Sequence, residues 1–365
     1  MRARAVGAIN LGQGFPDVDG PDALKEAAVR AIEEGRGNQY PAPHGIPELR
    51  QAIAAHQKRY YGIDLDWETE VVVTTGASEA LQSALLALVD VDDEVLIFEP
   101  WFDIYEVGVE MARGRVVGVP STQSLRPDFE ALRSRITSKS KVIVINTPHN
   151  PTGIVWSLDE LQELATIAIE NNLIVISDEA YEHLWFEEYR HRAIASLPGM
   201  FERTVTVGSA GKSFSFTGWK VGWASGPRNL IAAVRVVRQH LSYVSSGPFQ
   251  YAIAEGLHFP DQYWNEFKNS MQNKRDLFTL GLTELGFGII PSQGTYFLTT
   301  DVRPLGFKSG AEFVEASITK AGVVAIPHSR LCQDPEVGEP FVRWAYCKQD
   351  EILQQAIKNL QVFAR

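Results

Sequence analysis

The predicted fold rests on three consecutive stretches: KVIVINTPHNPTG (residues 141–153), DELQELATIAIEN (residues 159–171) and LIVISDEAY (residues 173–181). The first and third begin with continuously apolar runs, which are typical of parallel strands buried on both faces of a sheet. The middle stretch has apolar residues at helical spacing, and Ser157 just before it is a favoured N-cap type. Together they predict a β–α–β unit.

The same alternation extends in both directions along the chain. Further apolar runs lie at residues 71–74, 95–98, 204–207 and 221–224, and residues 78–89 have a helical pattern. Alternating strands and helices predict an α/β fold with a mostly parallel central sheet and helices on both faces. Ligands of such sheets bind at the carboxyl ends of the strands.

The C-terminal third has a different pattern. A long helical stretch at residues 262–285 is followed by the strand-like GTYFLT at 294–299 and by further short elements. This pattern predicts a smaller α+β domain. We expect residues 36–257 to form the large domain, and residues 1–35 and 258–365 to form the small domain with an N-terminal arm.

Composition limits the classes of function. The 365 residues include 34 Lys and Arg against 45 Asp and Glu, a net charge of −11, which argues against binding to nucleic acid or to an anionic membrane. Two cysteines, Cys332 and Cys347, are too few for a disulfide framework. The run AVGAI at residues 5–9 is shorter than the roughly 7–15 apolar residues of a secretion signal. We therefore expect a cytoplasmic protein.

Taken alone, one motif has two rival interpretations. It is GSAGKSFSFTGWKVGW, at residues 208–223. Lys212 follows a predicted strand, and Gly-Lys-Ser suggests a nucleotide-binding P-loop. That motif needs a glycine at position 206, where the chain has Thr206, so the P-loop interpretation fails. A turn with a solvated lysine remains the simple alternative.

Three other strand ends carry polar motifs. NTPHNPTG (146–153) reads as a rigid turn that fixes two side-chain amides. In SDEAY (177–181), Asp178 is either a ligand-facing acid or the N-cap of a following helix. TTGASEA (74–80) leads from a strand into a helix, whose N-terminus favours an anion such as phosphate. Each signal is weak by itself.

In combination and in this order, the motifs resemble the class I/II aminotransferases, which are fold-type I pyridoxal-phosphate enzymes. The resemblance runs from LGQGFPD, beginning at Leu11, to FVRWAYCK at residues 341–348. It implies pyridoxal 5'-phosphate as cofactor and transfer of an amino group between an amino acid and a 2-oxo acid by a ping-pong mechanism.

The resemblance also assigns the catalytic residues. Lys212 aligns with the lysine that bonds covalently to the cofactor and shuttles a proton. Asp178 aligns with the acid that keeps the pyridine nitrogen protonated, which makes the ring an electron sink. Tyr181 and Asn150 align with the residues that hydrogen-bond the phenolic oxygen. Phe102 aligns with the aromatic residue that stacks on the ring, with Trp101 as its rival.

The cofactor phosphate would be held by a separate set of residues, Gly76, Ala77, Ser78, Ser209 and Lys220. Lys220 replaces the commoner arginine, as in the kynurenine/glutamine aminotransferase branch, and supplies a point charge without bidentate geometry. Tyr40 resembles the tyrosine that reaches the phosphate from the neighbouring subunit. The resemblance thus implies a homodimer with shared active sites.

For the substrate, Arg343 resembles the arginine that binds the α-carboxylate, with Gly14 and Asn150 adding hydrogen bonds. His149 resembles a residue that supports the contacting residues from behind, rather than a catalytic base. The histidines show no metal-ligand spacing, so we expect no metal.

The residues expected around the substrate side chain disfavour a purely aromatic amino acid as substrate. Ser245 and Ser246 stand where the kynurenine branch has an aromatic residue and a histidine, which makes this pocket more open and polar. Segments such as LSYVSSGPFQ and GTYFLTTDVRPLGF resemble bacterial N-succinyl-LL-diaminopimelate aminotransferases, which use the glutamate/2-oxoglutarate pair. The alternative is a broad glutamine, methionine or kynurenine aminotransferase, with cysteine-conjugate β-lyase side activity.

Regulators that join an aminotransferase-like domain to a basic DNA-binding module form a different class. The acidic chain begins only a few residues before LGQGFPD, and we expect no such module in it.

Overall fold

A computed structural model describes residues 7–364 of the chain. Residues 1–6, which include the start of the predicted small domain and of the AVGAI run, and Arg365 lie outside the described residues. None of the helices within 7–364 is both long and apolar enough to cross a membrane.

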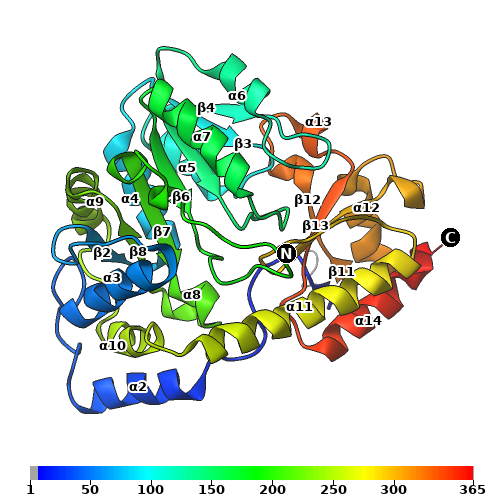
Figure 1. Cartoon of the computed structure of the whole chain (residues 1–365). Coiled ribbons are helices and arrows are strands. Elements are labelled where there is room, and N and C mark those ends of the chain that lie inside the picture. The colour runs from blue at the N-terminus through cyan, green and yellow to red at the C-terminus, as the bar shows by residue number, and fades with distance from the viewer. Residues whose placement is uncertain (1–6, 365) are drawn as a thin grey trace.

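A seven-stranded sheet forms the centre of the larger part of the molecule (Figure 1). Its spatial order is β2 (Val71–Thr74), β8 (Gly222–Ser225), β7 (Thr204–Ser209), β6 (Ile174–Asp178), β5 (Ser140–Asn146), β3 (Glu94–Phe98) and β4 (Arg115–Val119). β8 runs antiparallel to both neighbours, and the other pairings are parallel. This mostly parallel sheet confirms the predicted α/β class.

All six apolar runs of the large part are strands, and the sequence interpretation missed only β4 in this sheet. The β4 sequence, RVVGV, begins with an exposed arginine and is interrupted by Gly118, so its apolar run is short. The predicted parallel β–α–β unit is present, because β5 and β6 pair in parallel across α7 (Leu158–Glu170).

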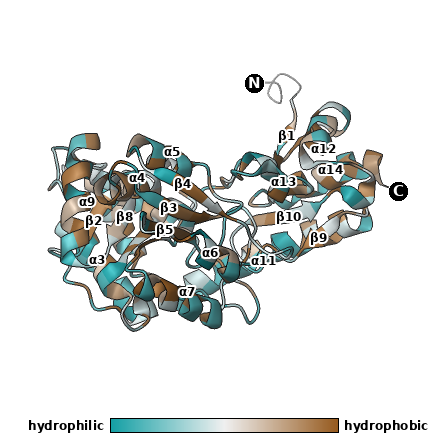
Figure 2. Cartoon of the chain, turned by 90° about the horizontal axis from the view of Figure 1, so that it is seen from above, coloured by the Kyte–Doolittle hydropathy of each residue, from teal (hydrophilic) through white to brown (hydrophobic). Residues whose placement is uncertain are grey.

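Helices cover both faces of this sheet. One face packs against α4 (Gly76–Leu88), α5 (Ile104–Met111) and α9 (Arg228–Leu241). The other face packs against α3 (Pro47–Tyr61), α6 (Phe129–Arg135) and α7. The central residues of strands β3 and β5 are accordingly hydrophobic, and the strands lie between helices with polar outer faces (Figure 2).

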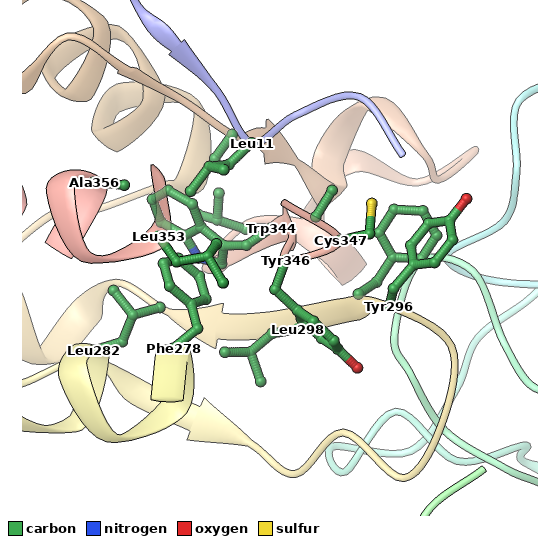
Figure 3. Close-up of a cluster of buried hydrophobic side chains, with 14 of the residues drawn as sticks. Leu11, Phe278, Leu282, Tyr296, Leu298, Trp344, Tyr346, Cys347, Leu353 and Ala356 are labelled. Atoms are coloured by element: carbon green, nitrogen blue, oxygen red, sulfur yellow. The ribbon is translucent and has the colours of Figure 1, made fainter. Parts of the chain in front are cut away.

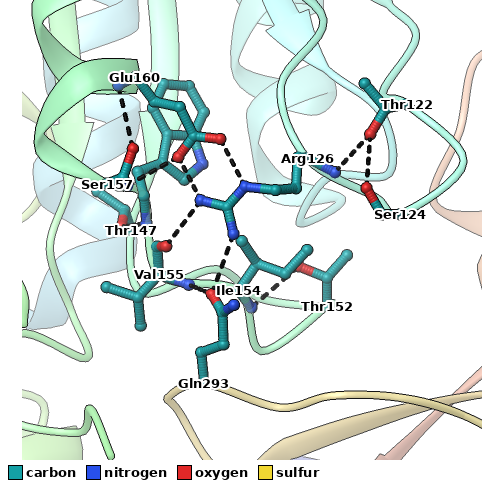
Figure 4. Close-up of polar contacts among 11 residues, drawn as sticks. Thr122, Ser124, Arg126, Thr147, Thr152, Ile154, Val155, Ser157, Glu160 and Gln293 are labelled. Carbon is teal, nitrogen blue, oxygen red and sulfur yellow. Dashed lines mark hydrogen bonds and ion pairs between the residues drawn. The ribbon is translucent and has the colours of Figure 1, made fainter. Parts of the chain in front are cut away.

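Ser157 is the N-cap of α7, as its position predicts. Its hydroxyl accepts a hydrogen bond from Glu160 N, and the Glu160 carboxylate accepts one from Ser157 N, which completes a capping box. Glu160 also pairs with Arg126, whose guanidinium reaches Gln293 at 3.2 Å (Figure 4). This contact links the helix to a loop of the C-terminal part.

The C-terminal part is built on a second, antiparallel sheet. Its order is β12 (Ile326–Pro327), β13 (Phe341–Ala345), β10 (Phe297–Asp301) and β9 (Gly288–Ile290). Helices α11 (Asp261–Glu284), α12 (Gly310–Ala316) and α14 (Asp350–Leu360) contribute to its core, in which Phe278 and Trp344 are buried (Figure 3). A smaller α+β unit is therefore present.

The N-terminal segment contacts both parts. β1 (Ile9–Asn10) pairs in parallel with β11 (Val323–Val324) of the C-terminal part. In contrast, α2 (Asp22–Glu33) packs through Ala27 and Ala28 against α10 (Gly247–Gly256) of the larger part. The exact division at residues 36 and 258 stays a prediction.

Candidate active site

A cavity of about 230 Å³ lies at the carboxyl ends of the central strands. Twelve of the predicted site residues line it: Gly14, Gly76, Ala77, Ser78, Phe102, Asn150, Asp178, Tyr181, Ser209, Lys212, Lys220 and Arg343. The structure thus gathers residues from the N-terminal segment, the central sheet and β13 around one space. Their individual roles stay predictions.

An anion-binding corner is formed where β2 enters α4. Gly76 has a φ of +75°, and a Cβ atom there would lie 3.0 Å from Lys220 Nζ. Gly222 allows β8 to approach closely, since a Cβ atom on it would lie 2.5 Å from Ala77 N. The N-terminus of a 13-residue helix and a lysine amine therefore meet at this corner, which suits a phosphate group.

Asp178 is the last residue of β6 and is buried. Its Oδ2 atom accepts a 2.6 Å hydrogen bond from Tyr105 Oη, and its Oδ1 atom accepts one from Ala180 N at 3.1 Å. Burial raises the pKa of Asp178, and the hydrogen bond from Tyr105 opposes this shift. A turn rather than a helix follows, so Asp178 is not a helix N-cap and its carboxylate faces the cavity.

Lys212 lies in the short helix α8 (Ala210–Ser213), directly after β7. It lines the cavity, and its Nζ atom donates hydrogen bonds to Tyr296 Oη at 2.8 Å and to Gly14 O at 3.1 Å. The alternative interpretation of this motif, a turn with a solvated lysine, is therefore wrong. Burial lowers the pKa of Lys212 to about 8, so about a tenth of the amine is neutral and nucleophilic at pH 7, far more than for an ordinary lysine.

Arg343 and Asn150 form a fixed pair at the other side of the cavity. Arg343 Nη1 donates to Asn150 Oδ1 at 2.8 Å, and Nη2 donates to Gly12 O at 2.6 Å. The guanidinium stacks over the Phe297 ring, with 4.4 Å between its central carbon and the ring centroid. The buried Nε atom has no hydrogen-bond partner among residues 7–364.

The NTPHNPTG turn is held together by Asn146. Its side chain accepts from Asn150 N and donates to Asp178 O, both at 2.7 Å. His149 lies behind the turn, where Nδ1 is 2.7 Å from Thr152 Oγ1. Burial lowers the pKa of His149 to about 4, so this side chain is neutral near pH 7. It does not line the cavity.

The structure also separates the two aromatic candidates for ring stacking. Phe102 lines the cavity, whereas Trp101 is buried in the core between the sheet and its helices. The sequence interpretation missed Tyr105 and Tyr296, which contact Asp178 and Lys212. Tyr105 lies three residues after Phe102 in the sequence, and this spacing is the signal that could have found it. Tyr296 had no such signal.

Three predicted residues do not line the cavity of this chain. Tyr40 is 79% exposed and packs edge-on against Tyr243. Ser245 is buried, and its hydroxyl donates to Thr74 O at 3.3 Å. Ser246 is the N-cap residue of α10. A role for these residues at the site would require a second chain or a larger substrate, and stays a prediction.

Among the described residues, His56, Glu182 and His183 are close enough together to ligate a metal ion. They lie outside the cavity, and His56 Nε2 is 2.8 Å from His183 Nε2, the distance of a direct hydrogen bond. Tyr61 Oη donates to Glu182 at 2.7 Å. No sequence spacing indicates this buried cluster, because His56 lies in α3, whereas Glu182 and His183 lie in the turn after β6.

A parallel sheet that carries a buried lysine, a strand-end acid and a helix N-terminus around one cavity defines a fold-type I site of the pyridoxal-phosphate class. The model of the family "Aminotransferase class I and II" matches residues 6–360, and the chain belongs to this family of pyridoxal-phosphate-dependent enzymes. It is an aminotransferase.

Two relatives and one solved structure show how similar the chain is to known members. It is 48% identical to "Probable N-succinyldiaminopimelate aminotransferase DapC" of Mycobacterium tuberculosis H37Rv, over 99% of this chain and 94% of that protein. It is 38% identical to kynurenine–oxoglutarate transaminase of Dictyostelium discoideum, over 97% and 90%. The solved structure of N-succinyldiaminopimelate aminotransferase from Mycobacterium tuberculosis has a TM-score of 0.95 at 47% identity, covering 100% and 95%.

Proposed function

We propose that this aminotransferase uses pyridoxal 5'-phosphate to transfer an amino group between N-succinyl-LL-2,6-diaminopimelate and 2-oxoglutarate. The observation that carries the choice of substrate is the 48% identity to the mycobacterial relative over almost the whole chain. The cavity adds the guanidinium of Arg343, whose positive charge and planar donors suit a substrate carboxylate.

The residues present fit the cofactor. The Gly76 corner, with Ala77, Ser78, Ser209 and Lys220, would hold the phosphate. The buried Asp178 carboxylate would hold a protonated ring nitrogen, and such a charge partner offsets the desolvation that raises its pKa. Phe102 would cover the ring, and Tyr181 and Asn150 would hydrogen-bond its phenolic oxygen. Lys212 would bind it covalently.

When bound, pyridoxal phosphate withdraws electrons from the substrate Cα and so acidifies its proton. Side chains and backbone groups of the protein would carry out the remaining steps. Arg343, with Gly14 and Asn150, would orient the α-carboxylate. Lys212 would accept the α-proton at Nζ and later return it to a second carbon, and its lowered pKa suits both directions of transfer.

A homodimer forms part of the proposal. Tyr40 and Tyr243 contact each other and are both exposed, and Val236 and Leu241 of α9 are exposed as well. A second copy covering this surface would bury the apolar side chains, and would allow its Tyr40 to reach the phosphate corner.

The second candidate is a broad glutamine, methionine or kynurenine aminotransferase with cysteine-conjugate β-lyase activity. It is favoured by Lys220 at the phosphate corner and by the relatives that carry kynurenine and methionine names, at 38% and 35% identity.

Two experiments test these proposals. Borohydride reduction of the purified enzyme, followed by peptide mapping, should place the reduced cofactor on Lys212; a different lysine would contradict the proposed site. A panel of amino donors with 2-oxoglutarate should then give the highest kcat/KM for N-succinyl-diaminopimelate. Higher values for kynurenine, methionine or glutamine would select the second candidate.

A further inference from the structure

The amine of Lys212 is held by two oxygen atoms from distant parts of the chain. Lys212 Nζ donates to Tyr296 Oη at 2.8 Å and to Gly14 O at 3.1 Å. Tyr296 Oη itself donates to the same Gly14 oxygen at 2.7 Å. The three polar atoms form a closed set, so that displacing any one of them breaks two hydrogen bonds.

Tyr296 is held rigidly. It is fully buried, and its ring packs edge-on against Tyr181 and Phe297 at centroid distances of 5.1 and 4.9 Å. Its carbonyl oxygen accepts a hydrogen bond from Tyr346 N at 3.0 Å. Figure 3 shows the ring at the edge of the C-terminal core, with its hydroxyl pointing away from the other labelled side chains. The hydroxyl is therefore a fixed acceptor.

Gly14 is fixed by close packing. A Cβ atom at this position would lie 2.4 Å from Phe297 Cζ and 3.1 Å from Tyr296 Cε2. Its carbonyl oxygen can approach Tyr296 and Lys212 only because residue 14 has no side chain. Of the three groups, only the lysine side chain, with its four-carbon stem, is free to move.

The number of acceptors matches the neutral amine. A neutral lysine amine has two N–H bonds and one lone pair, whereas the ammonium has three N–H bonds. The two oxygen atoms accept both N–H bonds of the neutral form and leave its lone pair unoccupied. Because Lys212 also lines the cavity, that lone pair is available to a proton from a molecule bound there.

We propose that Tyr296 is a positioning residue, which together with Gly14 O holds the free amine of Lys212 ready to accept the substrate's α-proton. This inference rests on the proposed role of Lys212. The lone pair of Nζ takes the proton and later releases it. The Tyr296 hydroxyl keeps its own proton and continues to donate it in a hydrogen bond to Gly14 O. Burial raises the pKa of Tyr296 well above its ordinary value, which keeps the hydroxyl protonated throughout.

The first test measures the lysine itself, with Tyr296→Phe and the matched control Tyr346→Phe. Tyr346 is equally buried, and its hydroxyl donates to Thr295 O at 3.1 Å without touching Lys212. In full-length protein stripped of cofactor, the rate of acylation of Lys212 by acetic anhydride is followed by peptide mass spectrometry. Loss of one hydrogen bond should raise this rate about 2- to 10-fold in Tyr296→Phe and leave it unchanged in Tyr346→Phe.

The second test measures proton transfer in the loaded enzyme. Single-turnover reactions with an amino acid deuterated at Cα should show a slower absorbance change and a larger isotope effect in Tyr296→Phe, with the KM and the cofactor dissociation constant unchanged. A merely structural role would change KM and cofactor affinity instead, and would overturn the proposal.

An unchanged acylation rate in Tyr296→Phe, or an equal rise in Tyr346→Phe, would also overturn it. The failure of the proposed function has a different signature, since wild-type enzyme would then not carry borohydride-reduced cofactor on Lys212. The acylation rates of the cofactor-free variants report on the hydrogen bond in either case.

Discussion

Tyr105 donates a 2.6 Å hydrogen bond to Asp178 in a site where both side chains are buried. The two residues come from α5 and from the end of β6, 73 positions apart. Because burial raises the pKa of Asp178 and this bond lowers it, Tyr105 helps to keep the carboxylate ionised.

We therefore predict that Tyr105→Phe lowers kcat about 10- to 100-fold, the range expected for one hydrogen bond to a charged group. The phenylalanine keeps the ring packing of the tyrosine, so the melting temperature should change little. Steady-state kinetics with thermal unfolding checks both points, and Tyr346→Phe serves as a buried control. Full activity in Tyr105→Phe would show that the bond does not support Asp178.

Asp178→Asn removes the charge but keeps the shape. We expect cofactor to remain bound through the phosphate corner and Lys212, while kcat falls by about 100-fold or more, as for loss of a preorganised electrostatic contact. Absorbance spectra report the bound cofactor and kinetics report the turnover. Retained turnover in Asp178→Asn would reject the role of this carboxylate as the partner of the ring nitrogen.

Arg343→Lys tests the carboxylate clamp. A lysine cannot keep the bonds to Asn150 and Gly12 and also present a planar, two-pronged donor to a carboxylate. We expect kcat/KM for amino donors to fall about 10- to 100-fold, while the cofactor dissociation constant is unchanged.

The control for this change is Arg303→Lys. Arg303 is exposed and pairs with Asp301 on the surface of the C-terminal part. Its kcat/KM should equal that of the wild type. A matching decrease in both variants would attribute the effect to a general loss of folding rather than to substrate binding.

The large sheet could be predicted from sequence because its strands are buried on both faces and so appear as continuous apolar runs. The residues at their ends could be predicted for a related reason, since Asn150, Asp178 and Lys212 each follow such a run within a few positions. The strand β4 was missed because its apolar run is interrupted by Gly118 and begins with an exposed arginine.

Contacts between distant segments could not be predicted in this way. Tyr296 is 84 positions from Lys212, and Arg343 is 193 positions from Asn150. Which aromatic or basic side chain reaches a strand end depends on how the C-terminal sheet sits against the central one, and local patterns carry no information about that. Motif spacing therefore located the lysine but not the residues that hold it.

Glu182 gives a prediction for stability against pH. This carboxyl is buried in the His56–His183 cluster, and burial raises its pKa from 4.5 to about 8. Between these two pH values the folded chain keeps a proton that the unfolded chain has lost, so this group's contribution to stability falls as the pH rises from about 4.5 to 8.

Glu182→Gln should remove that contribution, because glutamine does not titrate and its oxygen can still accept the bond from Tyr61. Relative to wild type, the variant should gain stability steadily between pH 5 and pH 8, by several kcal/mol at most. Urea unfolding across this range measures the difference, with the exposed Glu202→Gln as control. A constant difference at all pH values would contradict the assignment.

The capping box of α7 offers a test that does not involve the active site. Ser157→Ala removes the acceptor for Glu160 N, so the free energy of unfolding should fall by about 1 kcal/mol. Thr166→Ala is the matched control, because it deletes a hydroxyl from an exposed position inside the same helix and should stabilise slightly through helix propensity. Denaturant unfolding gives both values. Since Ser157 lies outside the cavity, kcat should be unchanged, and equal stability of the two variants would show that the capping box contributes nothing measurable.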